Sequence, residues 1–76
     1  MQHHELKVHR LLCPLPVIRT QDKIKQLAVG DQLTVYATDP GVMQDIPAWC
    51  RINGHKIVDT HAAAAEFIIT IEVCSS

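Results

Sequence analysis

Apolar and polar residues alternate along three stretches of the chain, with the two-residue period of a half-buried β-strand. These stretches are Glu5 to His9, Gln32 to Thr38 and Phe67 to Val73. A shorter stretch, Lys56 to Thr60, also has the composition of a strand. The alanines from Ala62 to Ala65 connect it to the last strand, which predicts a hairpin there.

Two stretches between these strands carry apolar residues at helical spacing. The first follows Cys13-Pro14-Leu15-Pro16 and is expected to stop at Gly30, a residue type common just past a helix C-terminus. Because proline is tolerated in the first turn of a helix, the motif marks the start and places Cys13 at or beside the N-cap. The predicted inward stripe is Val17, Ile24, Leu27 and Ala28, with Arg19, Lys23 and Lys25 facing outward.

The second helix lies between the turn signals Asp39-Pro40-Gly41 and Asn53-Gly54. Asp39 or Asp45 is available as its N-cap, and Pro47 leaves its first residue open. Its buried face is expected to consist of Val42, Ile46, Trp49 and Cys50.

The order of elements is therefore β-α-β-α-β-β in a chain of 76 residues, about the size of one small domain. No internal repeat or linker divides it, so residues 1–76 are expected to form a single domain. A strand-helix-strand series implies a parallel strand pair with a right-handed crossover. The predicted fold class is an α/β (α+β) two-layer sandwich: a four-stranded mixed sheet, both helices on one face, the other face open.

Charge is unevenly distributed although the formal net charge is −1. Up to Leu27 the chain carries five basic and two acidic side chains, whereas beyond it two basic residues face six acidic ones. The half with Cys13 is expected to present a positive surface suited to an acidic partner or an anionic sulfur species. Solvated charge without a target is the alternative.

Several classes of protein are disfavoured. The apolar runs are far shorter than the roughly 20 residues of a membrane span, and no apolar leader follows Met1. Cys13, Cys50 and Cys74 are odd in number and widely spaced, which argues against disulfides and predicts reduced thiols in the cytoplasm. The five histidines lack ligand spacing, so neither a metal nor a cofactor is expected. Near-neutral charge and three aromatic residues argue against direct nucleic-acid binding.

Cys13 is the candidate nucleophile. A free thiol has a pKa near ~8.5, and only its thiolate attacks. A helix N-terminus favours the anion by on the order of 0.3 to 2 kcal/mol, which lowers the pKa by roughly one unit or less in most cases. Pro14 and Pro16 would hold the sulfur in a defined position through their fixed φ angles. Such a thiolate can exchange sulfane sulfur, whereas an inert buried cysteine is the alternative.

The remaining candidates are assigned to packing. Cys50 shares a helical face with Ile46 and Trp49, which favours the core over a redox role. Trp49 is expected to anchor the second helix in the core rather than to stack on nucleic acid. Cys74 is assigned no function.

Four motifs together resemble the TusA (SirA-like) sulfur-carrier family over nearly the whole chain: Cys13-Pro14-Leu15-Pro16, Asp39-Pro40, Asp45-Ile46-Pro47 and Trp49-Cys50. The resemblance implies a sandwich like the C-terminal domain of a translation initiation factor. It also implies that Cys13 accepts a persulfide sulfur from a cysteine desulfurase or rhodanese and delivers it to a downstream acceptor protein. The acceptor route is commonly 2-thiolation of wobble uridine in tRNA, and relatives serve molybdenum-cofactor supply and sulfur oxidation. Such a protein acts as a sulfurtransferase-type relay and protein substrate more than as a stand-alone enzyme.

The chain departs from the family pattern just before the motif. Lys7, Arg10 and Leu12 stand where an Asp, a Gly and a basic residue are usual. The departure leaves the Cys-Pro-x-Pro chemistry intact but bears on which donor and acceptor the docking face recognises. The alternative function is a non-catalytic interaction module or thiol-based regulator that binds a partner through the same basic face.

Overall fold

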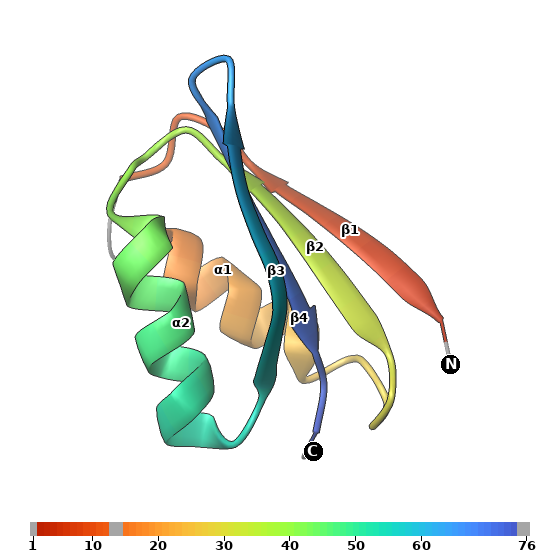
Figure 1. Ribbon diagram of the computed structural model, residues 1–76. Coiled ribbons are helices and arrows are strands. Elements are labelled where there is room, and N and C mark those ends of the chain that lie inside the picture. Colours follow the sequence, from red (N-terminus) through yellow and green to blue (C-terminus); the bar gives the residue numbers. More distant parts are fainter. Residues whose placement is uncertain (1, 13–14, 75–76) are drawn as a thin grey trace.

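A computed structural model describes residues 2–12 and 15–74, in which four strands and two helices follow one another as β-α-β-α-β-β (Figure 1). The predicted fold class is confirmed. The elements are β1 (His3–Val8), α1 (Leu15–Ile24), β2 (Gln32–Ala37), α2 (Val42–Asn53), β3 (Lys56–Ala63) and β4 (Glu66–Glu72).

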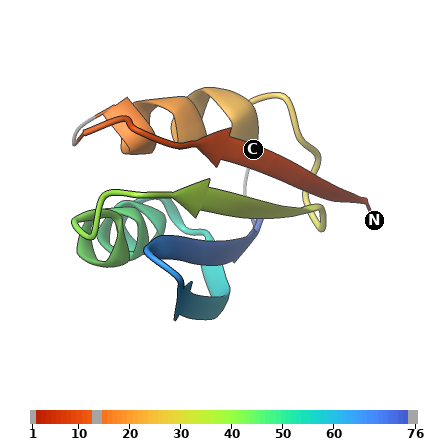
Figure 2. The ribbon, with the colours of Figure 1, turned by 90° about the horizontal axis from the view of Figure 1, so that it is seen from above.

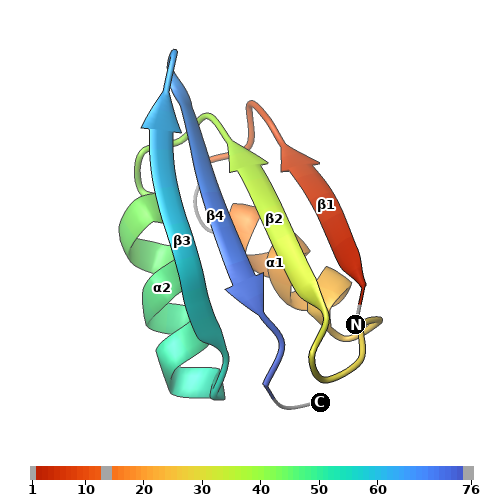
Figure 3. The same cartoon turned by 45° about the vertical axis from the view of Figure 1, so that its right-hand side comes forward.

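The four strands form one mixed sheet in the order β1-β2-β4-β3. β1 runs parallel to β2, as the crossover predicts, while β4 pairs antiparallel with both β2 and β3. Figure 3 shows the sheet in front with both helices behind it, and Figure 2 shows β1 and β3 at its two edges. One face is therefore covered by α1 and α2, and the other is open.

The core lies between the sheet and the helices. Register places Leu6 beside Val35 and Val35 beside Ile69, so alternate residues of neighbouring strands point toward the helices together. Fully buried side chains come from both layers and include Leu33, Val35, Val42, Ile46, Cys50, Ile69 and Ile71. The predicted strand periods and the inward face of α2 are thus confirmed.

α1 is shorter than the sequence indicates, because it ends at Ile24 rather than at Gly30. The Lys25 N–H still bonds to the Gln21 carbonyl four residues back at 3.2 Å, but the next two N–H groups bond only three residues back. Gln26 donates to the Lys23 carbonyl at 3.0 Å and Leu27 to that of Ile24 at 3.0 Å. These bonds tighten the chain into turns. Gly30, at φ 96°, donates its N–H to the Val73 carbonyl at 2.8 Å, so it serves the turn into β2.

The inward stripe of α1 also differs from the expectation. Ile24 and Leu27 are buried as predicted, but Ala28 is exposed. Thr20 takes a core position at 0% exposure, with its hydroxyl donating to the Pro16 carbonyl at 2.8 Å. A threonine can replace an apolar residue there because its one polar hydrogen is satisfied within the helix.

α2 begins at Val42, with Gly41 as the N-cap and no side-chain cap bond. The predicted caps, Asp39 or Asp45, are therefore wrong: the Asp39 carboxylate accepts the Gly41 N–H at 3.1 Å in a turn before the helix, and Asp45 lies in the first turn. Pro47 lies inside the helix. The predicted stop is confirmed, because Gly54 adopts φ 81° and its N–H bonds to the Cys50 carbonyl.

The hairpin between β3 and β4 is tighter than predicted. β3 continues beyond Thr60 to Ala63, so the connection is only Ala64 and Ala65. Both have positive φ, 50° and 65°, as a type I′ turn requires. This turn favours Asn-Gly, so two alanines adopt a strained backbone there. In residues 2–12 and 15–74, neither helix is long and apolar enough to cross a lipid bilayer.

Candidate functional site

The predicted nucleophile Cys13 and its neighbour Pro14 lie outside the described residues, so the site is built from the residues on either side. β1 ends at Val8 and α1 begins at Leu15, so Leu15 and Pro16 of the motif belong to the first turn of α1 and the motif starts just before it. The Leu15 N–H donates to the Leu12 carbonyl at 2.9 Å. The described residues 9–12, called the thiol loop below, lead into the motif.

Pro16 anchors the motif in the core. It lies in the first turn of α1, as predicted, and its side chain is fully buried. Its fixed φ suits a helix, and its missing N–H removes no intrahelical bond at this position. The Pro16 carbonyl also accepts the Thr20 hydroxyl. The residue three positions after Cys13 is therefore held by both packing and hydrogen bonding.

Two long-range contacts hold the start of the thiol loop. The His9 ring contacts the Glu66 carboxylate at the start of β4, and the Arg10 N–H donates to the Thr38 hydroxyl oxygen at 2.8 Å after β2. These contacts join positions 57 and 28 residues apart. They tie the segment before Cys13 to the start of β4 and to the residue that follows β2, and the sequence pattern does not predict either contact.

Arg10 adopts φ 64°, in the left-handed region. That conformation costs a residue other than glycine on the order of 1–2 kcal/mol. Arg10 stands where the family pattern has a glycine, so this departure keeps a backbone shape that glycine would adopt at lower cost.

Large apolar side chains are exposed around the motif. Leu12 is 72% exposed, Leu15 45% and Ile18 44%, and Arg10 and Arg19 are exposed nearby in the sequence. Exposed apolar residues gathered in one place are typical of a surface that binds another protein. The sequence interpretation identified the outward basic residues of this helix but not its outward apolar ones.

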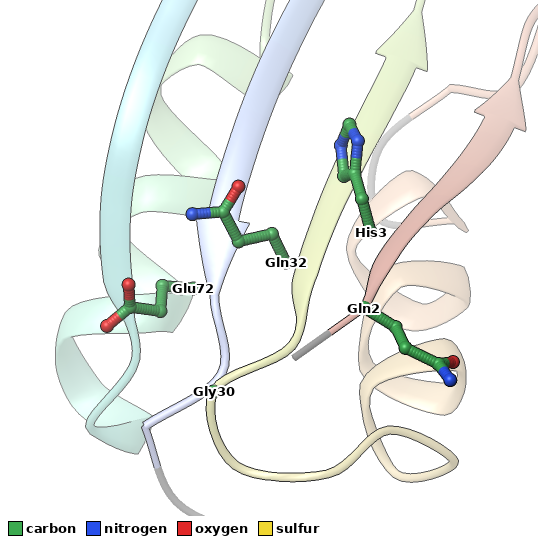
Figure 4. Close-up of a pocket in the computed structure, with 5 residues that line it drawn as sticks. All are labelled: Gln2, His3, Gly30, Gln32 and Glu72. Atoms are coloured by element: carbon green, nitrogen blue, oxygen red, sulfur yellow. The ribbon is translucent and has the colours of Figure 1, made fainter.

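A hollow of about 420 Å³ adjoins the thiol loop. It is lined by His9, Arg10, Thr38, Ala63, Ala64, Ala65 and Glu66. A second cavity, of about 180 Å³, lies at the start of β1 and β2 and is bordered by Gln2, His3, Gly30, Gln32 and Glu72 (Figure 4). Because the motif follows the far end of β1, this second cavity does not belong to the same site.

The other two cysteines differ in environment. Cys50 is 0% exposed, and desolvation by burial raises the pKa of its thiol to about 11, which confirms its role in the core. Cys74 is exposed and donates its S–H toward the Glu72 carbonyl at 3.5 Å.

Trp49 packs against the core, as predicted, and stacks on His55 with ring centroids 5.4 Å apart. Desolvation lowers the pKa of His55. Within the described part of the chain, no three His, Cys, Asp or Glu side chains gather in a metal-binding group.

Comparison with known proteins identifies the family. The profile of the family described as sulfurtransferase TusA matches residues 4–73. The chain belongs to the TusA family. The resemblance inferred from the motifs is therefore confirmed, while the roles of Cys13, Pro14 and Pro16 remain predictions.

Relatives of similar length support the same assignment. A Neisseria meningitidis protein named as a candidate sulfur carrier is 38% identical over 72 residues, covering 95% of this chain and 97% of that one. The sulfur carrier protein TusA of Pseudomonas syringae is 39% identical over 67 residues, covering 88% and 80% of the two chains. The crystal structure of a SirA-like protein from Desulfitobacterium hafniense superimposes with a TM-score of 0.82 at 19% identity, covering 95% of this chain and 99% of that one. That likeness shows the shared fold.

Proposed function

We propose that this TusA-family protein is a sulfur carrier that accepts persulfide sulfur on Cys13 and relays it to an acceptor protein. The observation that carries the proposal is the family match over residues 4–73 in a chain whose Cys13-Pro14-Leu15-Pro16 motif follows β1 and runs into the start of α1. The names of the Neisseria and Pseudomonas relatives support the same role.

The transfer is a thiol exchange without net redox change. The Cys13 thiolate attacks the outer sulfur of a donor persulfide. A bond forms between the Cys13 sulfur and that outer sulfur, the donor S–S bond breaks, and the donor thiolate leaves. An acceptor thiolate then attacks the outer sulfur on Cys13 in the same way. Both steps need an ionised thiol, and the start of α1 two residues after Cys13 supports that state through the helix dipole.

The donor is a cysteine desulfurase or a rhodanese, and the acceptor is a second sulfur-relay protein. Delivery toward 2-thiolation of wobble uridine in tRNA is the first route to examine, and another sulfur-trafficking pathway is the alternative. The exposed apolar side chains in and next to the motif suit contact with a protein rather than with a free metabolite. They are Leu12, Leu15 and Ile18. We expect the protein to act in the cytoplasm, where thiols are kept reduced.

The test compares wild type, Cys13→Ser and Cys74→Ser. Each is incubated with a cysteine desulfurase, pyridoxal phosphate and cysteine, and separately with a rhodanese and thiosulfate, followed by intact-mass measurement and peptide mapping. Cys74→Ser is the matched control because Cys74 is the exposed cysteine among the described residues. We expect a reductant-sensitive gain of about 32 Da, one sulfur, in wild type and Cys74→Ser but not in Cys13→Ser.

Two results would contradict the proposal. If Cys13 gained no sulfur from either donor, the carrier chemistry would be absent and a non-catalytic interaction module would be the better explanation. If Cys13→Ser gained as much sulfur as wild type, a different thiol would be the carrier.

A further inference from the structure

The hollow beside the thiol loop, lined by residues 9, 10, 38 and 63–66, is called the hairpin hollow here. We propose that it receives a short carboxylate-bearing segment of the protein that donates sulfur to Cys13. The inference rests on the proposed function, because it names where the donor of that function docks.

The position of the hairpin hollow favours a role in transfer at Cys13. His9 and Arg10 line it, and the three peptide links from Arg10 to Cys13 span at most roughly 11 Å. Figures 1 and 3 show the β3–β4 hairpin and the loop after β1 at the same end of the molecule. A protein that reaches Cys13 therefore passes close to this hollow.

The charges in the hollow favour an anionic group. The Glu66 carboxylate in the hollow already contacts the His9 ring, so one of its oxygens is occupied. Arg10 is exposed, and among the described residues no carboxylate lies within 4 Å of its guanidinium. Arginine binds carboxylates through two parallel hydrogen bonds. An acidic side chain of the partner is the group that this arrangement fits.

The size and wall of the hollow favour an extended segment. About 420 Å³ lies within the ~300–1,000 Å³ of typical ligand sites and cannot admit a folded domain. Ala63, Ala64 and Ala65 form one wall and are exposed. Their methyl groups leave room for a partner backbone to approach while still offering apolar contact.

Residues that line the hairpin hollow have strained backbone conformations, and this allows a specific test of the proposal. The described non-glycine residues with positive φ are Arg10, Ala64 and Ala65, and all three line the hairpin hollow. Glycine would adopt each of these conformations at lower cost. Substitution by glycine at one of these positions therefore removes a side chain from the hollow and also lowers the backbone strain there.

The experiment uses the Ala64→Gly/Ala65→Gly double variant, Arg10→Gly, and Ile52→Ala as an exposed control on α2. Three quantities are measured: the melting temperature, the rate of Cys13 alkylation by iodoacetamide across pH, and the desulfurase concentration that half-saturates sulfur transfer. The alkylation rate reports on the thiol without a partner protein, so an altered thiol pKa is separated from weakened docking.

We expect the double-glycine variant to melt several degrees higher and to alkylate like wild type. It should nevertheless need roughly threefold or more desulfurase for half-saturation, a loss of affinity from the removed contacts. Arg10→Gly should raise that concentration further and weaken its dependence on salt, because an ion pair is lost. Ile52→Ala should leave all three quantities unchanged.

A double-glycine variant that melts higher and saturates at the wild-type concentration overturns the docking proposal. The proposal is also overturned if only Arg10→Gly raises the half-saturating desulfurase concentration and added thiosulfate has the same effect on wild type. The hollow would then bind a small anion instead. If wild type itself accepted no sulfur from desulfurase or rhodanese, the proposed function would fail and this inference with it. If wild type accepted sulfur normally and the variants needed no more desulfurase than wild type for half-saturation, the docking inference would be wrong and the proposed function would stand.

Discussion

At the scale of single residues, the cysteines differ in reactivity according to their surroundings. Cys50 is fully buried with a thiol pKa of about 11, whereas Cys74 is exposed. At about pH 8 a thiol with that pKa is ionised only on the order of 0.1%, and the reagent must also reach it. We expect iodoacetamide to modify Cys74 but not Cys50 in the folded protein, and both after unfolding in guanidinium, as read by peptide mass mapping. Modification of Cys50 under native conditions would show that its site opens.

A second residue-scale prediction concerns the backbone of Arg10, whose φ is 64°. Arg10→Gly should raise the free energy of unfolding by about 1 kcal/mol, because glycine adopts this conformation with little strain. Arg10→Ala is the control, since alanine removes the same charge but keeps the strain. Urea unfolding measures both. An equal gain in the two variants would assign the effect to the side chain and not to φ.

At the scale of elements, Asp31 joins the start of β1 to the turn before β2. Its carboxylate accepts the Gln2 N–H at 3.0 Å and the Ala28 N–H at 3.1 Å, and the His4 ring lies 3.3 Å away. The Gln2 bond, followed by that from Ala28, lowers the pKa of Asp31 below its usual value. Because the Asp31 carboxylate accepts the Ala28 N–H, this side chain favours the turn before β2 and helps to explain why α1 ends at Ile24.

The lowered pKa has a defined effect on stability. The pKa of Asp31 in the folded protein lies below its value of about 3.9 in the unfolded chain, so the ionised carboxylate stabilises the fold above about pH 3.9. This contribution to stability is lost as the pH falls through the pKa of the folded protein. We expect Asp31→Asn to be less stable than wild type at neutral pH, with the difference shrinking in acid. Urea unfolding from neutral to acidic pH measures it, with the exposed Asp22→Asn as control. A difference that stayed constant with pH would contradict this role.

At the scale of the whole molecule, stability depends on one core between sheet and helices. Ile46 is 0% exposed and Ile52 is 82% exposed on the same helix, so the same substitution tests opposite environments. Ile46→Ala should cost about 2–5 kcal/mol, a large fraction of the roughly 5–15 kcal/mol typical of a domain. Ile52→Ala should change stability by less than about 0.5 kcal/mol. Similar losses in urea unfolding would show that α2 does not pack as described.

The order of elements, the inward faces of β2, β4 and α2, and the motif that points to the family could all be predicted from the sequence. Those features depend on residues close together in the chain: Leu33, Val35 and Ala37 alternate locally, and Gly54 ends α2 through a bond to Cys50 four residues before it. Local periodicity and backbone preference are sufficient for such features.

The sequence did not predict where α1 ends, that Thr20 is buried, that β4 lies between β2 and β3, or how the thiol loop is held. Each depends on groups far apart in the chain, as with Gly30 and Val73 or His9 and Glu66. A hydrogen bond between distant residues leaves no periodic signal in either segment. It forms only because folding brings its donor and acceptor close together in space.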